Sequence, residues 1–413
     1  MLLTAQTAKM NITWKKGLQL TTKEEATRVT ISSCPAVLPD VFEGAPCLKK
    51  VCILGSDRVA NISVLLKYPI VQLTMSEGCR DTHTLMRMEK LEYLSIGIFD
   101  PRVLSHLRSL KTLDINCTCL AEVLYRLPEA LESLTLRKEI DHDIDVRRVS
   151  NTSLKSLNIY QCTTSLEFVT KFSHLTKLTI RDVNIRAIGP IVNLHHLTDL
   201  TIKNVSNLDM LPLNLDLPNL LQLHIRYCAL PNLDFLERVP SVRQLTLKKF
   251  ITESENFDSV YSMKNLFQLR LDGTNISCLK GIERLKDTLV YLTLTDCRNV
   301  EDITPLASFR KLRTLELRGT SVYDISPIGS IRTLRTFSSP ETILNGLHCL
   351  FGLKRVKVST SQIAINVYTD EGIRSKHIPL EDKIVSGSVI SKAVASIDYV
   401  DESVGQTIKC NRS

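Results

Sequence analysis

The sequence predicts an α/β solenoid, with a parallel sheet of about sixteen short strands on a concave face and short helical or 3₁₀ turns on the convex side. Three observations lead to this fold class: a leucine motif that recurs at a nearly constant interval, a proline signal in the segments between the copies, and a composition rich in aliphatic residues. Of the 413 residues, 43% are hydrophobic and only 5% are aromatic. The core therefore has to be aliphatic, as expected when many thin layers stack on one another.

The motif L-x-x-L-x-L, with conservative replacements, occurs sixteen times between Ala26 and Leu353, and successive copies begin 19 to 24 residues apart. Clear copies are LESLTL from Leu131, LTDLTI from Leu197 and LRTLEL from Leu312. Apolar residues two apart lie on one face of a strand. An interval near 22 residues leaves room for one strand and one return segment per coil, so successive strands stack in parallel. Positions are numbered below from the first aliphatic residue of each copy.

The return segments carry a helix-start signal. Gly189, Thr304 and Ser326 are each followed by Pro, which is the order of an N-cap and a first helical residue. Only seven or eight residues then remain before the next strand, which is enough for a short helix or a 3₁₀ turn. We therefore expect the block to curve, with its strands on the concave face.

Position nine of each copy should face the interior, where a small side chain can satisfy neighbouring backbone groups. In several of the sixteen copies the residue there is Cys or Thr, including Cys34, Cys162, Cys228, Cys297, Thr118, Thr274 and Thr320. We expect small, nearly apolar core residues rather than metal ligands, because stacked copies bring no ligands together. The twelve cysteines include no CxxC pair, which favours reduced thiols in a reducing compartment.

These motifs resemble the leucine-rich-repeat family over residues 26–361. The I-x-P-L/I turns are similar to those of the short-coil subtype found in bacterial internalins and SDS22-type phosphatase regulators. The Cys and Thr at position nine, with irregular copy lengths, are similar to trypanosomatid leucine-rich-repeat proteins. The resemblance implies a horseshoe or arc that binds proteins, mainly on its concave face.

Three regions follow from the repeat. Residues 1–25 form a predicted N-terminal cap, in which Trp14, Leu18 and Leu20 could cover the first coil; residues 26–361 form the solenoid; residues 362–413 form a C-terminal cap and tail. Caps are expected because the ends of a solenoid expose core. The segment QIAINVYTD at 362–370 should be a strand that closes the last coil. Residues 371–413 favour β-structure and form either a small extension of the cap or a loosely held tail.

The charge balance and the N-terminus limit the classes of protein. Lys plus Arg exceed Asp plus Glu by 52 − 44 = 8, and the charges are scattered. The first residues contain no apolar stretch long enough for a signal peptide, and no stretch of 18 apolar residues could span a membrane. The sequence thus favours an intracellular, cytoplasmic protein, although seven N-x-S/T sequons would suit a secreted one.

The sequence predicts no enzyme and no cofactor. It contains no P-loop, GxGxxG, HExxH, GxSxG or kinase motif in a suitable context. Cys117 and Cys119 fall where a strand ends, and the acidic run 141–145 fits a solvated loop better than a divalent-metal site. His195 and His196 should be exposed in a return segment.

A column of basic residues is the feature that points to a binding surface. Position seven should point outward from the concave face, and in six central copies it holds Arg137, Tyr160, Arg181, Lys203, Arg226 and Lys248. Neighbouring positions add His224, Tyr227 and Lys249. These nine residues are called the basic stripe. Stacked strands lie about 4.8 Å apart, so the charges repel one another unless an acidic partner meets them. The alternative interpretation is an ordinary solvated face of a basic protein.

Asp272, Thr295 and Arg318 interrupt the column farther along, which places the predicted site in the central coils. The leading hypothesis is a protein-interaction scaffold for an acidic partner. Alternatives are a regulatory or targeting subunit of an enzyme complex, such as a phosphatase or ubiquitin ligase, and an internalin-like surface adhesin. Nucleic acid is disfavoured because few aromatic side chains could stack on bases, and no small-molecule substrate is indicated.

Overall fold

The computed structural model divides into two compact units, Met1–Leu197 (unit 1) and Thr198–Ser413 (unit 2). The described residues are 8–13, 26–32, 34, 36–38, 40, 42, 45–55, 59–116, 120–137, 144–150, 153–161, 166–183, 189–205, 216–252, 257–338, 340, 345–351, 353–357, 362–369, 372–379, 384–386, 388, 390, 399–401 and 406–408.

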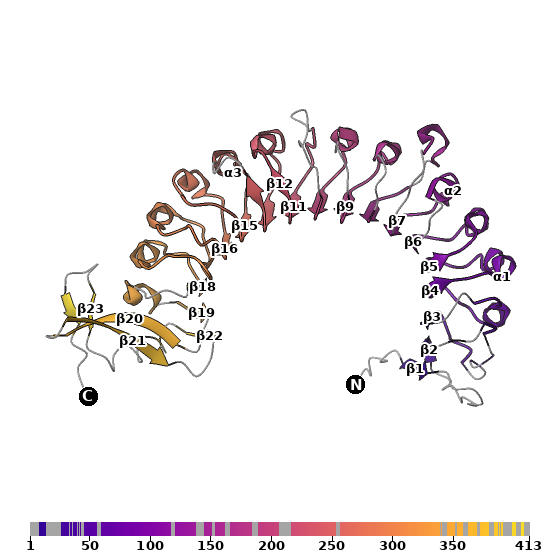
Figure 1. Ribbon diagram of the computed structural model, residues 1–413, viewed down its shortest axis with the longest axis horizontal. Helices are drawn as coiled ribbons and strands as arrows, with labels where there is room; N and C mark the ends of the chain where they lie inside the picture. The colour runs from indigo at the N-terminus through magenta and orange to yellow at the C-terminus, as the bar shows by residue number, and fades with distance from the viewer. Residues whose placement is uncertain are drawn as a thin grey trace, which may run out of the picture. The chain divides into compact units, whose positions relative to one another are not determined.

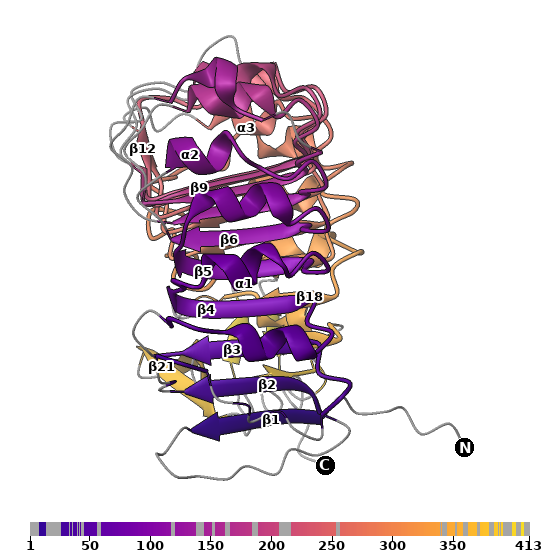
Figure 2. The same ribbon diagram turned by 90° about the vertical axis from the view of Figure 1, so that its right-hand side faces the viewer.

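Unit 1 is a stack of parallel strands. They are β1 (Ala8–Thr13), β2 (Ala26–Ser32), β3 (Lys50–Leu54), β4 (Gln72–Gly78), β5 (Tyr93–Ile98), β6 (Thr112–Asn116), β7 (Ser133–Arg137), β8 (Ser156–Tyr160) and β9 (Lys177–Arg181). Each strand pairs with the next one along the chain, and Figure 2 shows β1 to β6 one above another. Strands β2 to β9 coincide with copies of the motif, as predicted, because the alternating aliphatic residues need one buried face.

Short helical turns form the other side of unit 1. They are η1 (Ser63–Lys67), α1 (Thr82–Met86), η2 (Pro101–His106), α2 (Leu120–Leu124), η3 (Val146–Arg148), η4 (Glu167–Lys171) and η5 (Gly189–Asn193). Within the unit, the strands line the inner side of the curve and the turns line the outer side (Figure 1). The predicted placement of strands on a concave face and turns on a convex face is therefore confirmed for this unit.

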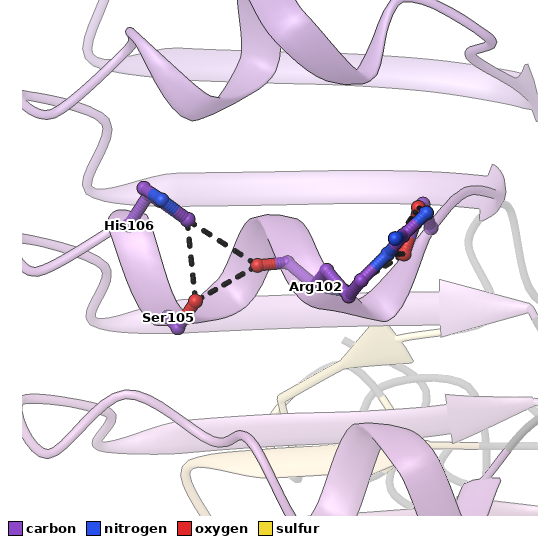
Figure 3. A network of polar contacts seen from close by, with 4 residues as sticks. Arg102, Ser105 and His106 are labelled. Atoms are coloured by element: carbon purple, nitrogen blue, oxygen red, sulfur yellow. Dashed lines mark hydrogen bonds and ion pairs between the residues drawn. The ribbon is translucent and has the colours of Figure 1, made fainter.

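Local polar contacts stabilise the convex turns, as η2 illustrates (Figure 3). The carboxylate of Asp100 accepts a hydrogen bond from the Arg102 N–H (2.9 Å) and pairs with the Arg102 guanidinium. At the end of the turn, the Ser105 hydroxyl donates to the Arg102 carbonyl (2.9 Å), and His106 Nδ1 lies 3.2 Å from that hydroxyl. Asp100 holds Arg102 rather than His106, so the cluster caps a turn and does not form a relay of acid, base and nucleophile.

Unit 2 repeats the same architecture. Its parallel strands are β10 (Asp199–Lys203), β11 (Gln222–Arg226), β13 (Gln244–Lys248), β15 (Gln268–Asp272), β16 (Tyr291–Thr295), β17 (Thr314–Glu316), β18 (Thr336–Ser338) and β19 (Arg355–Lys357). Its turns are η6 (Asp234–Arg238), α3 (Asp258–Tyr261), η7 (Ile282–Leu285), η8 (Thr304–Ser308), η9 (Ser326–Ser330) and η10 (Leu347–Leu350). A second small parallel pair, β12 (Ala229–Leu230) and β14 (Ile251–Thr252), lies beyond the ends of β11 and β13.

Positions one, four and six of each coil form the core. In the coil of β11 these are Leu220, Leu223 and Ile225, all at most 1% exposed. Burying each such side chain contributes about 1.5–3 kcal/mol relative to leaving it in water. The residues between them, such as Gln222, are only partly covered and face outward.

Position nine is buried, as predicted, wherever it lies among the described residues. Cys34, Cys228, Cys297, Thr274 and Thr320 are all less than 9% exposed. The Thr320 hydroxyl donates to the Leu317 carbonyl (2.7 Å), and Cys297 Sγ lies 3.4 Å from Thr274 Oγ1. Burial raises the pKa of the Cys34 thiol to about 11. No disulfide joins any of the cysteines that the structure describes. Cys162 and Thr118 lie outside the described residues.

Position eight adopts a left-handed backbone in many coils, a feature the sequence analysis did not predict. Its φ is 46° to 55° where it is occupied by Gln161, Asp182, Asn204, Tyr227, Lys249 or Asp296, and Gly55, Gly273 and Gly319 adopt similar values. This conformation turns the N–H of position eight toward the next coil. There it donates to the carbonyl of position seven, as from Tyr227 to Lys248 (2.8 Å) and from Lys249 to Asp272 (2.6 Å).

At the two ends the structure describes only part of the chain. The N-terminal region contributes β1, a further parallel strand, while Trp14, Leu18 and Leu20 lie outside the described residues. The expectation that residues 362–370 close the last coil is wrong. Strand β20 (Gln362–Thr369) forms a hairpin with β21 (Gly372–Pro379), and the last coil strand, β19, pairs antiparallel with β22 (Ile384–Val385). A hairpin brings its two strands together at a small loop-closure cost, which favours the local pairing.

A further short antiparallel pair, β23 (Tyr399–Asp401) and β24 (Gln406–Ile408), follows in unit 2. Within the part of the chain that the structure describes, no helix is both long enough and apolar enough to cross a bilayer.

Candidate partner-binding surface

In unit 1, three residues of the basic stripe form one aromatic–cation cluster. Arg137, Tyr160 and Arg181 end strands β7, β8 and β9 and are aligned by the strand register. The guanidinium carbon of Arg137 lies 4.9 Å from the centre of the Tyr160 ring, and that of Arg181 lies 5.9 Å from it. Each contact contributes about 0.5–1 kcal/mol at an exposed site, so the ring fixes the direction of both arginines.

Both arginines of this cluster also contact carboxylates within the chain. Arg137 binds Asp114 through Nε (2.8 Å) and a terminal nitrogen (3.1 Å), and this contact raises the pKa of Arg137. Arg181 Nε contacts Asp182 at 2.9 Å. The sequence analysis missed Asp114, which projects from position five of the preceding coil. The unit 1 part of the stripe is therefore largely neutralised by its own neighbours.

In unit 2, Lys203, Arg226 and Lys248 end strands β10, β11 and β13, again in register. Lys203 Nζ lies 5.6 Å from the centre of the Tyr227 ring. Lys248 Nζ contacts Asp272 Oδ2 at 2.8 Å, and a terminal nitrogen of Arg270 lies 3.7 Å from the same oxygen. The Asp272 side chain is only 4% exposed. Asp272, which was predicted to interrupt the column, thus contacts Lys248, the last of the six position-seven residues of the stripe.

The remaining stripe cations of unit 2 have no such carboxylate among the described residues. No ion pair with a described residue holds Lys203, Arg226 or Lys249. Lys249 and Tyr227 occupy position eight in the left-handed conformation, and Tyr227 is 46% exposed. This part of the surface carries uncompensated positive charge.

Strand β11 carries two polar atoms that lack partners. Arg226 Nε and His224 Nδ1 are buried and make no hydrogen bond within the described structure. Burial lowers the pKa of His224; the charge of Arg226 acts in the same direction and that of Asp199 in the opposite one. The imidazole is therefore neutral at neutral pH.

The N-terminal ends of the unit 2 strands add groups that the sequence analysis missed. Gln222, Gln244 and Gln268 occupy position three of three successive coils and are aligned in register. Beside them, Phe267 and Tyr291 form an edge-to-face pair with ring centres 5.2 Å apart, and both are about 40% exposed. The sequence could have indicated the glutamine row, because position three is expected to face outward in every copy.

The other candidate sites contain residues with structural roles or residues that lie outside the described part of the chain. A groove of about 560 Å³ lies beside η7 and η8, but its acidic groups cap turns: Glu283 accepts from the Gly281 N–H and Asp302 from the Thr304 N–H. In the acidic run, Asp145 caps η3, while residues 141–143 lie outside the described residues, as do Cys117 and Cys119. His195 and His196 are exposed, as expected.

Comparison with solved structures shows similar folds. An internalin (inlF) from Listeria monocytogenes is 17% identical with a TM-score of 0.51, over 76% of this chain and 87% of that one. A leucine-rich-repeat protein of Leptospira interrogans is 16% identical with a TM-score of 0.53, over 78% and 87%. TLR13, solved in complex with ssRNA13, is 14% identical with a TM-score of 0.54, over 81% and 60%. No family model and no curated protein matches the sequence.

Proposed function

The chain has the leucine-rich-repeat fold, and we propose that it is a protein-interaction scaffold that binds an acidic partner on the concave side of unit 2. The observation that supports this most directly is the charge of that surface. Lys203, Arg226 and Lys249 project from three successive coils without a carboxylate partner among the described residues. Holding these charges together is unfavourable in the free protein, and an acidic surface relieves the repulsion.

The chemistry of the surface suits binding rather than catalysis. Cations, amides and exposed aromatic rings are the groups that orient and hold a protein partner. Unit 1 contributes less to the proposal, because Arg137 and Arg181 already contact Asp114 and Asp182. A targeting subunit of an enzyme complex and an adhesin would be particular forms of such a scaffold, distinguished by the partner itself. An intracellular location is part of the proposal and is supported by the buried thiols at position nine.

The first test uses a fluorescent oligoglutamate peptide and the full chain. Changing Lys203, Arg226 and Lys249 together to Glu should abolish binding, because sign reversal repels an acidic ligand more than truncation would. The control changes Arg238, Lys264 and Arg284 to Glu; all three are exposed in the convex turns of the same unit. This control should bind as the unaltered protein does, with fluorescence polarisation as the readout and circular dichroism as the check of folding.

Ionic strength provides a second readout of the same proposal. Raising the salt from about 0.1 M to about 1 M shortens the screening length from about 10 Å to about 3 Å, so binding should weaken strongly. Equal behaviour of the two triple variants, or binding that is indifferent to salt, would show that the basic stripe is only a solvated face. Because TLR13 was solved with an RNA, a single-stranded oligonucleotide serves as the competitor.

A further inference from the structure

Two unpartnered buried atoms on one strand point to a missing ligand. Among the described residues, three buried side-chain polar atoms lack a hydrogen bond, and two of them, His224 Nδ1 and Arg226 Nε, lie on β11. Residues two apart on a strand face the same side, and here that side is the concave one. An unsatisfied buried polar group costs about 1–3 kcal/mol and is rare in native proteins. Both atoms are covered by the protein in the free state, so a ligand can reach them only if the side chains over them move aside. A ligand that then accepts from both groups would remove this cost.

The surroundings define the charge of that ligand. Lys203 and Lys248 flank Arg226 in register on the two neighbouring strands, and Lys249 directly follows Lys248. The acidic groups nearby are Asp199, whose charge acts on His224, and Asp272, which contacts Lys248. The neutral imidazole can place its N–H at Nδ1 and so act as a second donor beside the guanidinium. The ligand is thus an anion that offers several acceptor oxygens at once.

A phosphoryl group fits this arrangement better than a single carboxylate. It carries close to two negative charges and three acceptor oxygens, enough to meet the guanidinium, the imidazole and the unpaired Lys203 together. Arginine is also the side chain best matched to phosphate oxygens. We propose that Arg226 and His224 form a docking point for a phosphoryl group carried on a segment of a partner protein. This inference deepens the proposed function and rests on it.

The residues next to the docking point favour a protein as the carrier. The amides of Gln222, Gln244 and Gln268 form a row along the same face, and such amides can both donate to and accept from the backbone of an extended peptide. The exposed Phe267 and Tyr291 pair beyond them offers an apolar contact for a side chain. A nucleic acid would instead need a series of rings on which successive bases stack, whereas Tyr227 already contacts Lys203.

The first experiment reads His224 directly. The full chain is labelled with ¹⁵N-histidine, the His224 signal is assigned from His224→Gln, and the imidazole is titrated in sodium phosphate and in sodium chloride of equal ionic strength. In the free protein, burial and Arg226 lower the pKa of His224. A phosphate ion at this point opposes the effect of Arg226, so the pKa of His224 should rise in phosphate only.

Substitutions at Arg226 make the test specific. Arg226→Met should weaken phosphate binding about tenfold or more, because a charge-assisted hydrogen bond is lost. Arg226→Lys should restore part of the affinity, and Arg238→Met, an exposed arginine of η6, should change nothing. If His224 titrates alike in phosphate and chloride, or if Arg226→Met binds phosphate as the unaltered protein does, the docking point does not exist.

Peptides then separate this inference from the proposed function. One acidic peptide is compared with and without a phosphoserine, and a single-stranded oligonucleotide is tested beside them. Tighter binding of the phosphopeptide, lost in Arg226→Met, supports the inference. Equal binding of both peptides leaves the acidic-partner proposal standing and overturns the phosphoryl site. An oligonucleotide that binds where the phosphopeptide does not overturns the protein-borne carrier, and no binding of any probe overturns both proposals.

Discussion

Position eight is occupied by two kinds of residue. In several coils it holds Gly, Asn or Asp, the residues that tolerate a left-handed backbone. In others it holds Gln161, Tyr227 or Lys249, of which the last two lie beside the candidate surface. For such side chains the conformation costs roughly 1 kcal/mol. Strained residues persist where the surrounding structure holds them, and they concentrate at functional sites. We therefore expect Tyr227 and Lys249 to lower the free energy of unfolding and to be retained because their side chains contact a partner.

Replacing Lys249 by Asn tests this view. Asn adopts the left-handed conformation more readily, so Lys249→Asn should raise the free energy of unfolding by about 1 kcal/mol while weakening oligoglutamate binding. Urea unfolding and fluorescence polarisation give the two readouts. Lys286→Asn is the control, because Lys286 has an ordinary φ of −55° and should gain no stability. A loss of stability in Lys249→Asn would mean that the contact of the Lys249 side chain with Gly273 outweighs the strain.

The sequence could predict where each stripe residue stands along its coil, but not what it touches. Position follows from the repeat spacing, which is a local property of the chain. The contacts of Arg137 with Asp114 and of Lys248 with Asp272 join residues 23 and 24 apart. They depend on side-chain directions in neighbouring coils, so charge counts along one column overstated the free charge.

At the level of strands and turns, the repeat predicted most of the architecture. Strands at the motif copies and short turns at the Thr-Pro and Ser-Pro pairs were both confirmed, because each follows from a pattern inside one coil. The N-cap assignment was off by one residue, since the turns begin at Thr304 and Ser326 themselves. The partner of β20 was not predictable in this way. Its alternating residues are suited to any sheet edge, and only the competition between β21 and the last coil decides the pairing.

The junction of β4 and β5 allows a sharp test of a backbone requirement. The pairing register shifts between Met75 and Gly78, and Gly78 has a φ of 125°. A Cβ at Gly78 would lie 2.2 Å from the carbonyl oxygen of Ile98, whereas a Cβ at Gly55 would meet nothing within 4 Å. Gly78→Ala should therefore lower the free energy of unfolding by about 3 kcal/mol or more, since backbone must move.

Gly55→Ala is the matched control for that experiment. Its φ of 60° is also left-handed, so it should cost only about 1 kcal/mol. Urea unfolding followed by circular dichroism compares the two. Equal losses would show that conformational strain alone, rather than the close approach of β5, determines the requirement for glycine at position 78.

At the scale of the whole chain, each coil pairs with the coils before and after it, so damage should stay local. Leu223→Asp buries a carboxylate in the core and should cost about 3 kcal/mol or more. Hydrogen exchange should show lost protection in β10, β11 and β13 but retained protection in β17 and β18. Gln222→Asp, on the outward side of the same strand, is the control and should leave protection unchanged. Uniform loss of protection throughout unit 2 would contradict this expectation.

The boundary between the two compact units is a whole-chain feature that the sequence does not mark. It falls between Leu197 and Thr198, inside the motif copy LTDLTI. The repeat continues across it without a change in composition. A pattern that defines every coil in the same way contains no information on where a group of coils ends.

The hydrogen bonds made at position eight have a consequence for how such a chain can evolve. Since the N–H of Asn204, Tyr227 and Lys249 each reaches the carbonyl at position seven of the following coil, positions seven and eight are fixed from coil to coil. The interval between copies nevertheless varies from 19 to 24 residues, and the return segments absorb that variation. Insertions and deletions on the convex side therefore leave the order of side chains on the concave side intact. The two sides can diverge independently, one in length and the other in specificity.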